Sequence, residues 1–293
     1  MLRLEDLGER GLIRELEARG LTGHIGDDTA VLEGGVVVTL DTLVEEVHFR
    51  KEWISWLDLG YKAAAVNLSD LAAAAAKPTA LVVSLAVPPQ MFADDVFDFY
   101  RGLNEPGVLV RGGDTVTSSH TVITVMAIGY STLVPGRSGA RPGDIVVVTG
   151  PLGASAAGLR ALERGINAEQ FIAAHRRPPI RLHEGQQLGC IATAMADLSD
   201  GLAVEAGHIA SESGCCIKIS VENVPIAQGI ELIGDDPFWA MGEDYELIAT
   251  VPESVVSELG FPVIGSCVEG SGVEITYRGN PVKLSGWEHF GHE

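Results

Sequence analysis

The sequence predicts an α+β protein built from two α+β domains, and three observations support this prediction. The chain has 293 residues, and at about 150 residues per domain that length corresponds to two domains. Segments typical of helices and of strands follow one another without strict alternation, which favours α+β domains over one doubly wound sheet. Residues 131–144 concentrate proline, glycine and arginine. We therefore expect an N-terminal domain at 1–134 and a C-terminal domain at 135–293.

The first domain is expected to begin with an amphipathic helix over residues 5–20, because leucine and isoleucine recur on one face. Residues 58–76 predict an alanine-rich helix with Asp58 as its N-cap and an end at Lys77-Pro78. The other elements expected are strands at 35–41 and 81–87, a helix at 94–103, and strands at 108–110 and 121–130 around a Gly-Gly-Asp turn.

In the second domain, a glycine turn at 150–153 leads from a strand at 145–149 into a helix. Such a turn can cradle a phosphate at the helix N-terminus, and it can equally be a plain strand-to-helix connection. The other elements expected are helices at 168–174, 179–195 and 201–213, and strands at 221–225, 245–251 and 262–267.

Charge and composition exclude several classes of protein. The chain carries 40 acidic and 20 basic residues, so it has no basic surface for nucleic acid, and anionic membranes are disfavoured for the same reason. Its acidic start is not a signal peptide, and no apolar run approaches the ~20 residues of a membrane span. The cysteines form no C-x-x-C pair, and P-loop, G-x-S-x-G, H-E-x-x-H, EF-hand and protein-kinase motifs are absent. We expect a cytoplasmic protein.

The most informative feature is the placement of the acidic residues. They stand beside glycines, hydroxyl residues and predicted ends of elements: Asp27, Asp28, Asp41, Asp70, Asp114, Asp197, Asp200, Glu243 and Asp244. Carboxylate and hydroxyl oxygens, together with substrate phosphates, are the ligands that Mg²⁺ prefers. The pattern therefore predicts magnesium binding next to a phosphorylated substrate.

These residues also have plain structural interpretations. Ser199 or Asp200 can be a helix N-cap, and Asp41 can be an ordinary turn acid. Asp70 is harder to explain in this way, because aspartate has a poor propensity for the middle of a helix. His48 is compatible with a packed histidine, and Trp287 with an anchor that docks the chain end onto the core.

Taken in order, the motifs resemble those of the thiamine-monophosphate kinase family. The broader superfamily includes aminoimidazole ribonucleotide synthetase, selenophosphate synthetase and a hydrogenase-maturation ATPase. The matching strings are collinear over nearly the whole chain: GDDTAVL (26–32), TLDTLVEEVHF (39–49), YKAAAVNLSDLAA (61–73), GGDT (112–115), RSGARPGD (137–144), VTGPLGASAAGL (148–159), DLSDGL (197–202), GHI (207–209), GEDYEL (242–247) and GWEHF (286–290).

The resemblance implies a homodimer formed through the N-terminal sheet, a C-terminal domain that closes the ATP cleft, several Mg²⁺ ions, and ATP and thiamine monophosphate as substrates. The metal ligands that it implies are Asp28, Thr39, Leu40 (through its backbone), Asp41, Asp70, Asp114, Asp197 and Asp200. Asp28, Asp41, Asp70, Asp114 and Asp197 are the implied catalytic residues. The implied nucleotide contacts are Gly113, Asp114, Arg137 and Ser199, and the implied thiamine phosphate contacts are His48, Glu243 and Trp287.

The chain departs from the family pattern at Glu46, Ala74-Ala75, Glu205 and Met241, and none of these changes removes an implied metal ligand. The implied reaction converts ATP and thiamine monophosphate into ADP and thiamine diphosphate, by direct in-line transfer without a phospho-enzyme. A phosphate oxygen is already ionised near neutral pH, so aspartates, magnesium and one arginine suffice without a strong general base. Three alternatives stay open: another ATP-using enzyme of the superfamily, a non-catalytic acidic metal-binding module, and an inactive structural dimer partner.

Overall fold

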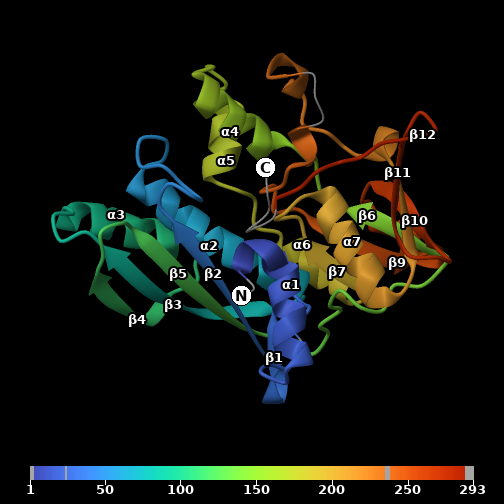
Figure 1. The fold of residues 1–293 in the computed structure, drawn as a ribbon, viewed down its shortest axis with the longest axis horizontal. Helices are drawn as coiled ribbons and strands as arrows, with labels where there is room; N and C mark the ends of the chain where they lie inside the picture. Colours follow the sequence, from blue (N-terminus) through green and yellow to red (C-terminus); the bar gives the residue numbers. More distant parts are fainter. Residues whose placement is uncertain (1–2, 24, 235–237, 288–293) are drawn as a thin grey trace.

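The computed structural model describes residues 3–23, 25–234 and 238–287. These residues form a five-stranded sheet of order β1-β2-β5-β3-β4 and a seven-stranded sheet of order β12-β11-β8-β10-β6-β9-β7. Both sheets are mixed, since each combines antiparallel and parallel neighbours. Figure 1 shows the two sheets on opposite sides of the molecule, with helices packed against each. The α+β prediction is confirmed.

Among the described residues, helices pack against one face of the five-stranded sheet only. Its strands are β1 (Ala30–Leu32), β2 (Val36–Val44), β3 (Lys77–Val87), β4 (Val110–Thr117) and β5 (Val122–Tyr130). Alternate side chains of β5, such as Ile123 and Val125, are buried beneath helices α2 (Trp56–Ala73) and α3 (Ala93–Asn104). The opposite face is open within the chain, as the lower left of Figure 1 shows.

Helices α2 and α3 cross at two glycines. A Cβ atom on Gly60 would clash with the carbonyl oxygen of Phe99, and one on Gly102 would clash with that of Leu57. Only glycine therefore permits the two backbones to approach so closely. The N-cap of α2 is Ser55, whose Oγ accepts the backbone N–H of Asp58. The prediction of Asp58 as N-cap was wrong by three residues. Ser55 has the extended backbone of an N-cap, and its hydroxyl oxygen accepts the N–H of Asp58, which is already inside the helix.

The seven-stranded sheet forms the centre of the second domain. Its strands are β6 (Asp144–Val148), β7 (Ala194–Asp197), β8 (Cys216–Ser220), β9 (Leu247–Pro252), β10 (Val263–Val268), β11 (Gly272–Tyr277) and β12 (Asn280–Pro281). Its helices are α4 (Ala154–Arg164), α5 (Glu169–Arg176), α6 (Leu182–Gly189), α7 (Leu202–Ser213) and α8 (Val256–Leu259). A core of buried aliphatic side chains, including Val148, Ile209 and Ile248, lies between this sheet and helices α4 and α7.

Three expected elements of the chain differ from the structure. The helix expected at 179–195 ends at Gly189, and the buried run from Ala194 to Asp197 is strand β7. The expected strand at 221–225 begins instead with a 3-10 turn, Val221–Asn223, and the strand is the preceding β8. The Gly-Gly-Asp sequence lies within β4 and not in a turn. Short apolar runs do not distinguish strand from helix by periodicity, which explains the first of these errors.

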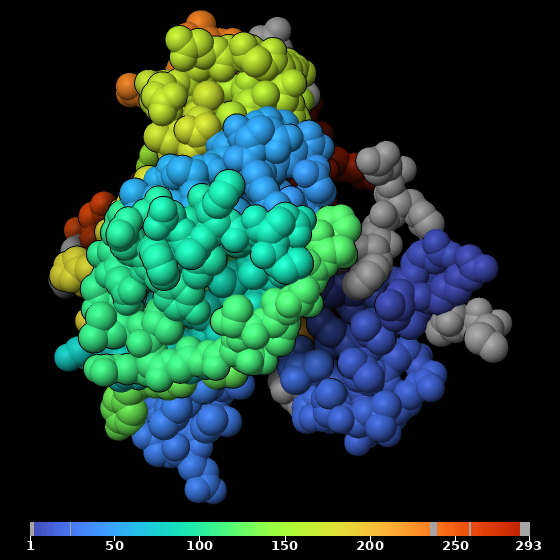
Figure 2. All heavy atoms as spheres, turned by 90° about the vertical axis from the view of Figure 1, so that its left-hand side faces the viewer, coloured from blue at the N-terminus to red at the C-terminus, as the bar shows by residue number. Residues whose placement is uncertain are grey.

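The N-terminal helix α1 (Leu4–Ala18) matches the expected amphipathic helix, with a kink at Gly8, whose φ is 65°. Figure 2 shows this helix in blue beside the green sheet domain. The remaining 3-10 turns are Glu33–Gly35, Ile230–Leu232, Phe238–Ala240 and Glu253–Val255. Within the described ranges, no helix is both long and apolar enough to cross a membrane.

Helix α2 joins the two domains. Ala72 and Ala73 at its end pack with Val147 and Leu247 of the second sheet. Near its start, the guanidinium of Arg177 stacks over the ring of Tyr61 at 3.9 Å and pairs with Asp58 and Glu105. In Figure 2, the yellow-green α4–α5 region lies directly on the light-blue residues around the start of α2. The connection between the sheets spans residues 131–143, and the division at 134/135 stays a prediction.

Candidate active site

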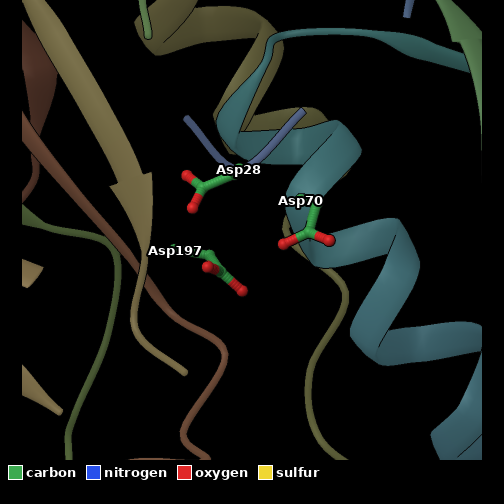
Figure 3. Close-up of side chains that lie close together, drawn as sticks. All are labelled: Asp28, Asp70 and Asp197. Atoms are coloured by element: carbon green, nitrogen blue, oxygen red, sulfur yellow. The ribbon is translucent and has the colours of Figure 1, made fainter. Parts of the chain in front are cut away.

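Three carboxyl groups from both domains meet where α2 contacts the second sheet. Asp28 comes from the loop before β1, Asp70 from α2, and Asp197 from the end of β7. One carboxylate oxygen of each lies within 4.8 Å of those of the other two. Figure 3 shows the three carboxylates turned toward a common space. The structure thus brings together three of the implied metal ligands, which are separated by up to 169 positions in the chain.

Neighbouring hydroxyl groups fix the orientation of this cluster. The Thr39 hydroxyl lies 2.5 Å from Asp70 Oδ2 and 3.1 Å from the backbone oxygen of Asp28. The hydroxyl of Ser69, which is buried, donates to Asp197 Oδ2 at 2.7 Å across the domain junction. Asp41 lies beside the cluster, because its register partner Val125 faces α2 and its charge acts on Asp70.

Burial without a counter-cation disfavours ionisation of these acids. It raises the pKa of Asp70 and Asp197 well above the ordinary value, and repulsion from neighbouring carboxylates adds to the effect. Burial also raises the pKa of Asp28 to about 7, against the attraction of Arg137, and that of Asp41 to about 6. Such a set of carboxyl groups holds protons until a cation replaces them.

Two atoms of the cluster indicate that a metal ion fits. Asp28 Oδ2 and Asp197 Oδ1 are buried oxygens without a hydrogen-bond partner in the described structure. A buried acceptor without a partner is costly, and a cation bound between the carboxylates would satisfy both oxygens. Hard oxygen donors of this kind suit Mg²⁺.

Arg137, from the segment between the sheets, lies at the edge of the cluster. Its Nη2 atom is 2.5 Å from Asp28 Oδ1 and 2.9 Å from Oε2 of the fully buried Glu205. Its backbone N–H donates to Asp27 at 3.0 Å. The arginine therefore neutralises part of the acidic charge beside the cluster.

Glu243 forms a second group of interacting side chains. Its Oε1 is 3.1 Å from Lys62 Nζ, and its Oε2 is 3.2 Å from His175 Nδ1. Burial raises the pKa of Glu243, but the charge of Lys62 is the largest of the influences that outweigh burial and leave the pKa below the ordinary value. The charge of His48 contributes to this lowering, and His48 Nδ1 accepts the backbone N–H of Val44 at 3.0 Å. The implied role of both residues in contacting thiamine phosphate stays a prediction.

Sequence reasoning missed Lys62 and His175. A signal for Lys62 was present, since it is the one basic side chain in the apolar string YKAAAVNLSDLAA. A lysine in the middle of a helix is ordinarily solvent-exposed, so its position in the sequence does not by itself reveal burial. His175 had no such signal, because it is followed by two arginines on a short amphipathic helix.

Asp114 does not join the three-aspartate cluster within the chain. It is exposed on β4 and pairs in register with Ser84, whose side chain also lies on the open face. Leu40 is 53% exposed and lies on the same face, opposite Met126. Gly113 has a backbone role, since a Cβ there would clash with the carbonyl oxygen of Val83. Asp114 and Gly113 on β4 therefore lie apart from the three-aspartate cluster, whereas the backbone of Leu40 lies between Thr39 and Asp41 of β2, beside that cluster.

The Ser199–Asp200 turn links the cluster to the end of the described chain. The carbonyl of Ser199 accepts the N–H of Glu243 at 2.6 Å, and that of Asp200 accepts the N–H of Trp287 at 3.0 Å. Neither side chain caps α7, whose N-cap is Gly201, so the capping interpretation was wrong. Burial raises the pKa of Asp200 to about 6. The Trp287 side chain is 49% exposed, and residues 288–290 of the GWEHF motif lie outside the described residues.

The backbone N–H groups of the glycine turn before α4 bind a carboxylate of the protein itself. Asp244 Oδ2 accepts the N–H of Gly153 at 2.8 Å, and Oδ1 accepts that of Ser155 at 3.4 Å. The carboxylate thus occupies the helix N-terminus where a phosphate would have bound. Burial raises the pKa of Asp244 to about 7 in spite of these donors. The plain structural interpretation of this turn is the one that the contacts support.

Comparison with known proteins gives consistent results. The family models "AIR synthase related protein, N-terminal domain" and "AIR synthase related protein, C-terminal domain" match residues 26–131 and 141–278. Thiamine-monophosphate kinase from Aquifex aeolicus is 34% identical over 99% of this chain and 100% of its own. That from Salmonella typhimurium is 37% identical over 91% of both chains, and that from Bacillus subtilis is 40% identical over 78% of this chain and 77% of its own.

Solved structures agree with these sequence relatives. The structure described as "AaThiL complexed with AMPPCP and TMP" superposes with a TM-score of 0.91 at 34% identity, over 99% of both chains. A hydrogenase maturation protein, HypE, in complex with ATP superposes with a TM-score of 0.73 at 19% identity over 97% of this chain and 98% of its own, and shares the fold.

Proposed function

Since the chain belongs to the thiamine-monophosphate kinase family of AIR synthase related proteins, we propose that it transfers the terminal phosphate of ATP to thiamine monophosphate, giving ADP and thiamine diphosphate. One observation in the molecule carries the proposal. The three-aspartate cluster and the Glu243 group adjoin, because the turn that follows Asp197 contacts Glu243 directly: the Ser199 carbonyl accepts the N–H of Glu243 at 2.6 Å. This adjacency supports a site in which metal-bound phosphates at the aspartates lie next to the thiamine ring at Glu243.

The metal part of the proposal rests on the donor set. Asp28, Asp70 and Asp197 would hold Mg²⁺, with the Thr39 hydroxyl, the Leu40 carbonyl and the carboxylates of Asp41 and Asp200 as further ligands. When bound, Mg²⁺ neutralises phosphate charge and aligns the donor and acceptor phosphates. The two buried, unpartnered carboxylate oxygens of the cluster support this assignment.

The transfer is proposed to be direct. An oxygen of the thiamine monophosphate phosphate forms a bond to the γ-phosphorus, and the bond between that phosphorus and the β–γ bridging oxygen breaks, so that ADP leaves. The nucleophilic oxygen is already ionised, so no side chain needs to remove a proton. Arg137 donates to phosphate oxygens through its planar guanidinium, and Ser199 and Gly113 contact the nucleotide.

The thiamine end of the substrate is assigned to the Glu243 group. The thiazolium ring carries a positive charge, which an ionised carboxylate attracts. Glu243 is held ionised by Lys62 and lies near His48. Trp287 has a half-exposed ring next to the Asp200 turn, and a tryptophan face attracts a cation.

We also propose that the open face of the first sheet binds a second copy of the chain. Leu40, Val116 and Tyr130 are 53%, 46% and 49% exposed there, which is a large apolar surface for a chain of net charge −20. Asp114 lies on the same face. A homodimer would therefore cover the apolar strands and bring Asp114 and Gly113 to an interface, where they can serve the site of the other copy. Cytoplasmic localisation stays a prediction.

A panel of acceptors tests the proposed function. The protein is incubated with Mg-ATP and, separately, thiamine, thiamine monophosphate or formylglycinamidine ribonucleotide, and products are separated by chromatography. We expect a new phosphorylated product with thiamine monophosphate alone. Turnover of formylglycinamidine ribonucleotide instead would assign the chain to another activity of the superfamily.

A further inference from the structure

Lys62 is a buried cation. Its side chain is among the largest fully buried ones in the described part of the molecule, with 1% of the residue exposed, and it belongs to α2. An ammonium group out of contact with water is costly unless an anion compensates its charge. The anion is Glu243, whose Oε1 lies 3.1 Å from Lys62 Nζ. The pair links the first domain to the GEDYEL loop of the second.

The second oxygen of Glu243 also has a partner. His175 Nδ1 lies 3.2 Å from Glu243 Oε2 and 3.0 Å from the Ser155 hydroxyl, and His175 is buried. Burial and the charge of Lys62 lower the pKa of His175 to about 3, so the imidazole is neutral at ordinary pH. It then donates to Glu243 when its proton is on Nδ1. Lys62 is accordingly the cation that compensates the carboxylate from within the protein.

The backbone of Glu243 is fixed as tightly as its side chain. Its φ is 59°, a left-handed conformation that glutamate rarely adopts, and its N–H donates to the Ser199 carbonyl at 2.6 Å. Its side chain is nevertheless 32% exposed, in contrast to that of Lys62. Lys62 and His175 thus hold the carboxylate, which remains partly accessible to solvent. Positions of strained backbone that the surroundings maintain are typical of functional sites.

We propose that Lys62 is a positioning residue that acts through Glu243, keeping its carboxylate in place to receive the cationic ring of a thiamine-type phosphate. The inference rests on the proposed function, because it assigns the ligand of that site. Lys62 cannot touch the substrate itself, since it has almost no accessible surface. A purely structural lysine would join α2 to the GEDYEL loop without affecting how Glu243 binds a ligand. A positioning role and a structural role are therefore distinguished by changing Lys62 with and without the Glu243 carboxylate.

A double-mutant cycle tests the inference. Thiamine monophosphate binding is measured by calorimetric titration, without ATP, for the full chain and for Lys62→Met, Glu243→Gln and the double variant. We expect Lys62→Met to weaken binding about tenfold in the natural background but less than about twofold when Glu243 is already glutamine. Lys218→Met is the matched control, because it removes a lysine from a Lys–Glu pair on the surface, 2.8 Å from Glu274.

Equal losses in both backgrounds, or no loss in the natural one, would overturn the inference. Melting temperatures are recorded for every variant, and Lys62→Gln replaces Lys62→Met in the cycle if the latter does not fold. The parent protein separates this result from failure of the proposed function. If it neither binds thiamine monophosphate nor forms thiamine diphosphate, the proposed function fails. If it does both while Lys62→Met binds normally, only the role of Lys62 fails.

Discussion

Asp70 illustrates how a single carboxyl group can be costly to the fold and necessary to the site. It lies on α2 with two other carboxylates near it, and burial and their charges keep its pKa well above the ordinary value. Asparagine has nearly the same size and can still accept from Thr39, so Asp70→Asn removes the charge and leaves the packing unchanged. We therefore expect Asp70→Asn to change stability and activity in different ways.

We expect Asp70→Asn to lower turnover at saturating Mg²⁺ by at least about a hundredfold, because the metal loses an anionic ligand. Its melting temperature without Mg²⁺ should equal or exceed that of the parent protein, since one source of repulsion is gone. Kinetic assays and thermal unfolding check the two parts. Near-normal turnover would show that Asp70 has a structural role only.

The raised carboxyl pKa values also predict how stability depends on pH. Burial raises the pKa of Asp28 and Asp244 to about 7 and that of Asp41 and Asp200 to about 6, from 3.8. The folded chain then holds protons that the unfolded chain releases, so stability is greatest below the unfolded pKa and falls as pH rises through the folded values. We expect the melting temperature in EDTA to fall between pH 4.5 and pH 7.5, because this range extends from just above the unfolded pKa of 3.8 to just above the highest folded pKa of about 7.

Mg²⁺ should reverse this trend at its upper end, because it binds the deprotonated carboxylates. The rise in melting temperature on adding Mg²⁺ should be larger at the higher pH. The same rise at both pH values, or a melting temperature in EDTA that increases with pH, would contradict the assignment of these groups.

At the scale of single residues, the sequence predicted the aspartates of the cluster and Glu243, but not the two side chains that hold the Glu243 carboxylate. Asp28, Asp70 and Asp197 stand in motifs whose glycines and hydroxyl residues indicate a site. Lys62 and His175 acquire their roles only when α2 and α5 bring them to Glu243. Chain position alone does not show which side of a helix will be buried against another domain.

At the scale of elements, α2 determines the arrangement of the site. It supplies Asp70 and Lys62 on one helix, and it packs against α3 on one side and the second sheet on the other. Its alanines permit close packing, and its crossing with α3 depends on Gly60 and Gly102. Small residues in this helix are therefore as much a part of the site as the charged ones.

Gly102→Ala tests the importance of this crossing. The new Cβ would meet the carbonyl oxygen of Leu57, which is backbone and cannot move aside, so the two helices must separate. We expect a loss of about 3 kcal/mol in the free energy of unfolding. Gly207→Ala in α7 is the control, because its Cβ would meet only Val273 at 3.9 Å and alanine favours a helix. Equal effects of both changes in denaturant titrations would refute the argument.

The sequence located most elements but not all of their limits. The expected helix at 94–103 agrees with α3 to within one residue at each end, and the expected strand at 81–87 ends where β3 ends, but β3 begins four residues earlier, at Lys77, and contains Pro78. The helix expected at 179–195 was too long, because the apolar run IATAMA reads equally well as helix or strand. Residues 194–197 form a strand because they pair with β9, which lies about fifty residues further along the chain.

At the scale of the whole molecule, the open face of the first sheet distinguishes a monomer from a dimer. Met126 lies at the centre of that face, on the middle strand β5. A lysine there would place a charge in the proposed interface without touching the core, which lies on the other face. We expect Met126→Lys to convert a dimer into a folded monomer, and turnover to fall with it because Asp114 would no longer reach the other copy.

Light scattering and circular dichroism check this prediction. Leu232→Lys, at a side chain 81% exposed in the second domain, is the control and should leave the dimer intact. A parent protein that is monomeric at assay concentration and fully active would rule out the dimer, and so would a Met126→Lys variant that stays dimeric.

The central claim is that the domain junction joins a phosphate-transfer centre to a thiamine-binding group. The most direct measurement follows ADP and thiamine diphosphate together, in one sample of the protein with ATP and thiamine monophosphate, before and after Mg²⁺ is added. The account predicts that neither product forms before the addition and that both then appear in equal amounts. ADP without thiamine diphosphate, from folded protein saturated with both substrates, would contradict it.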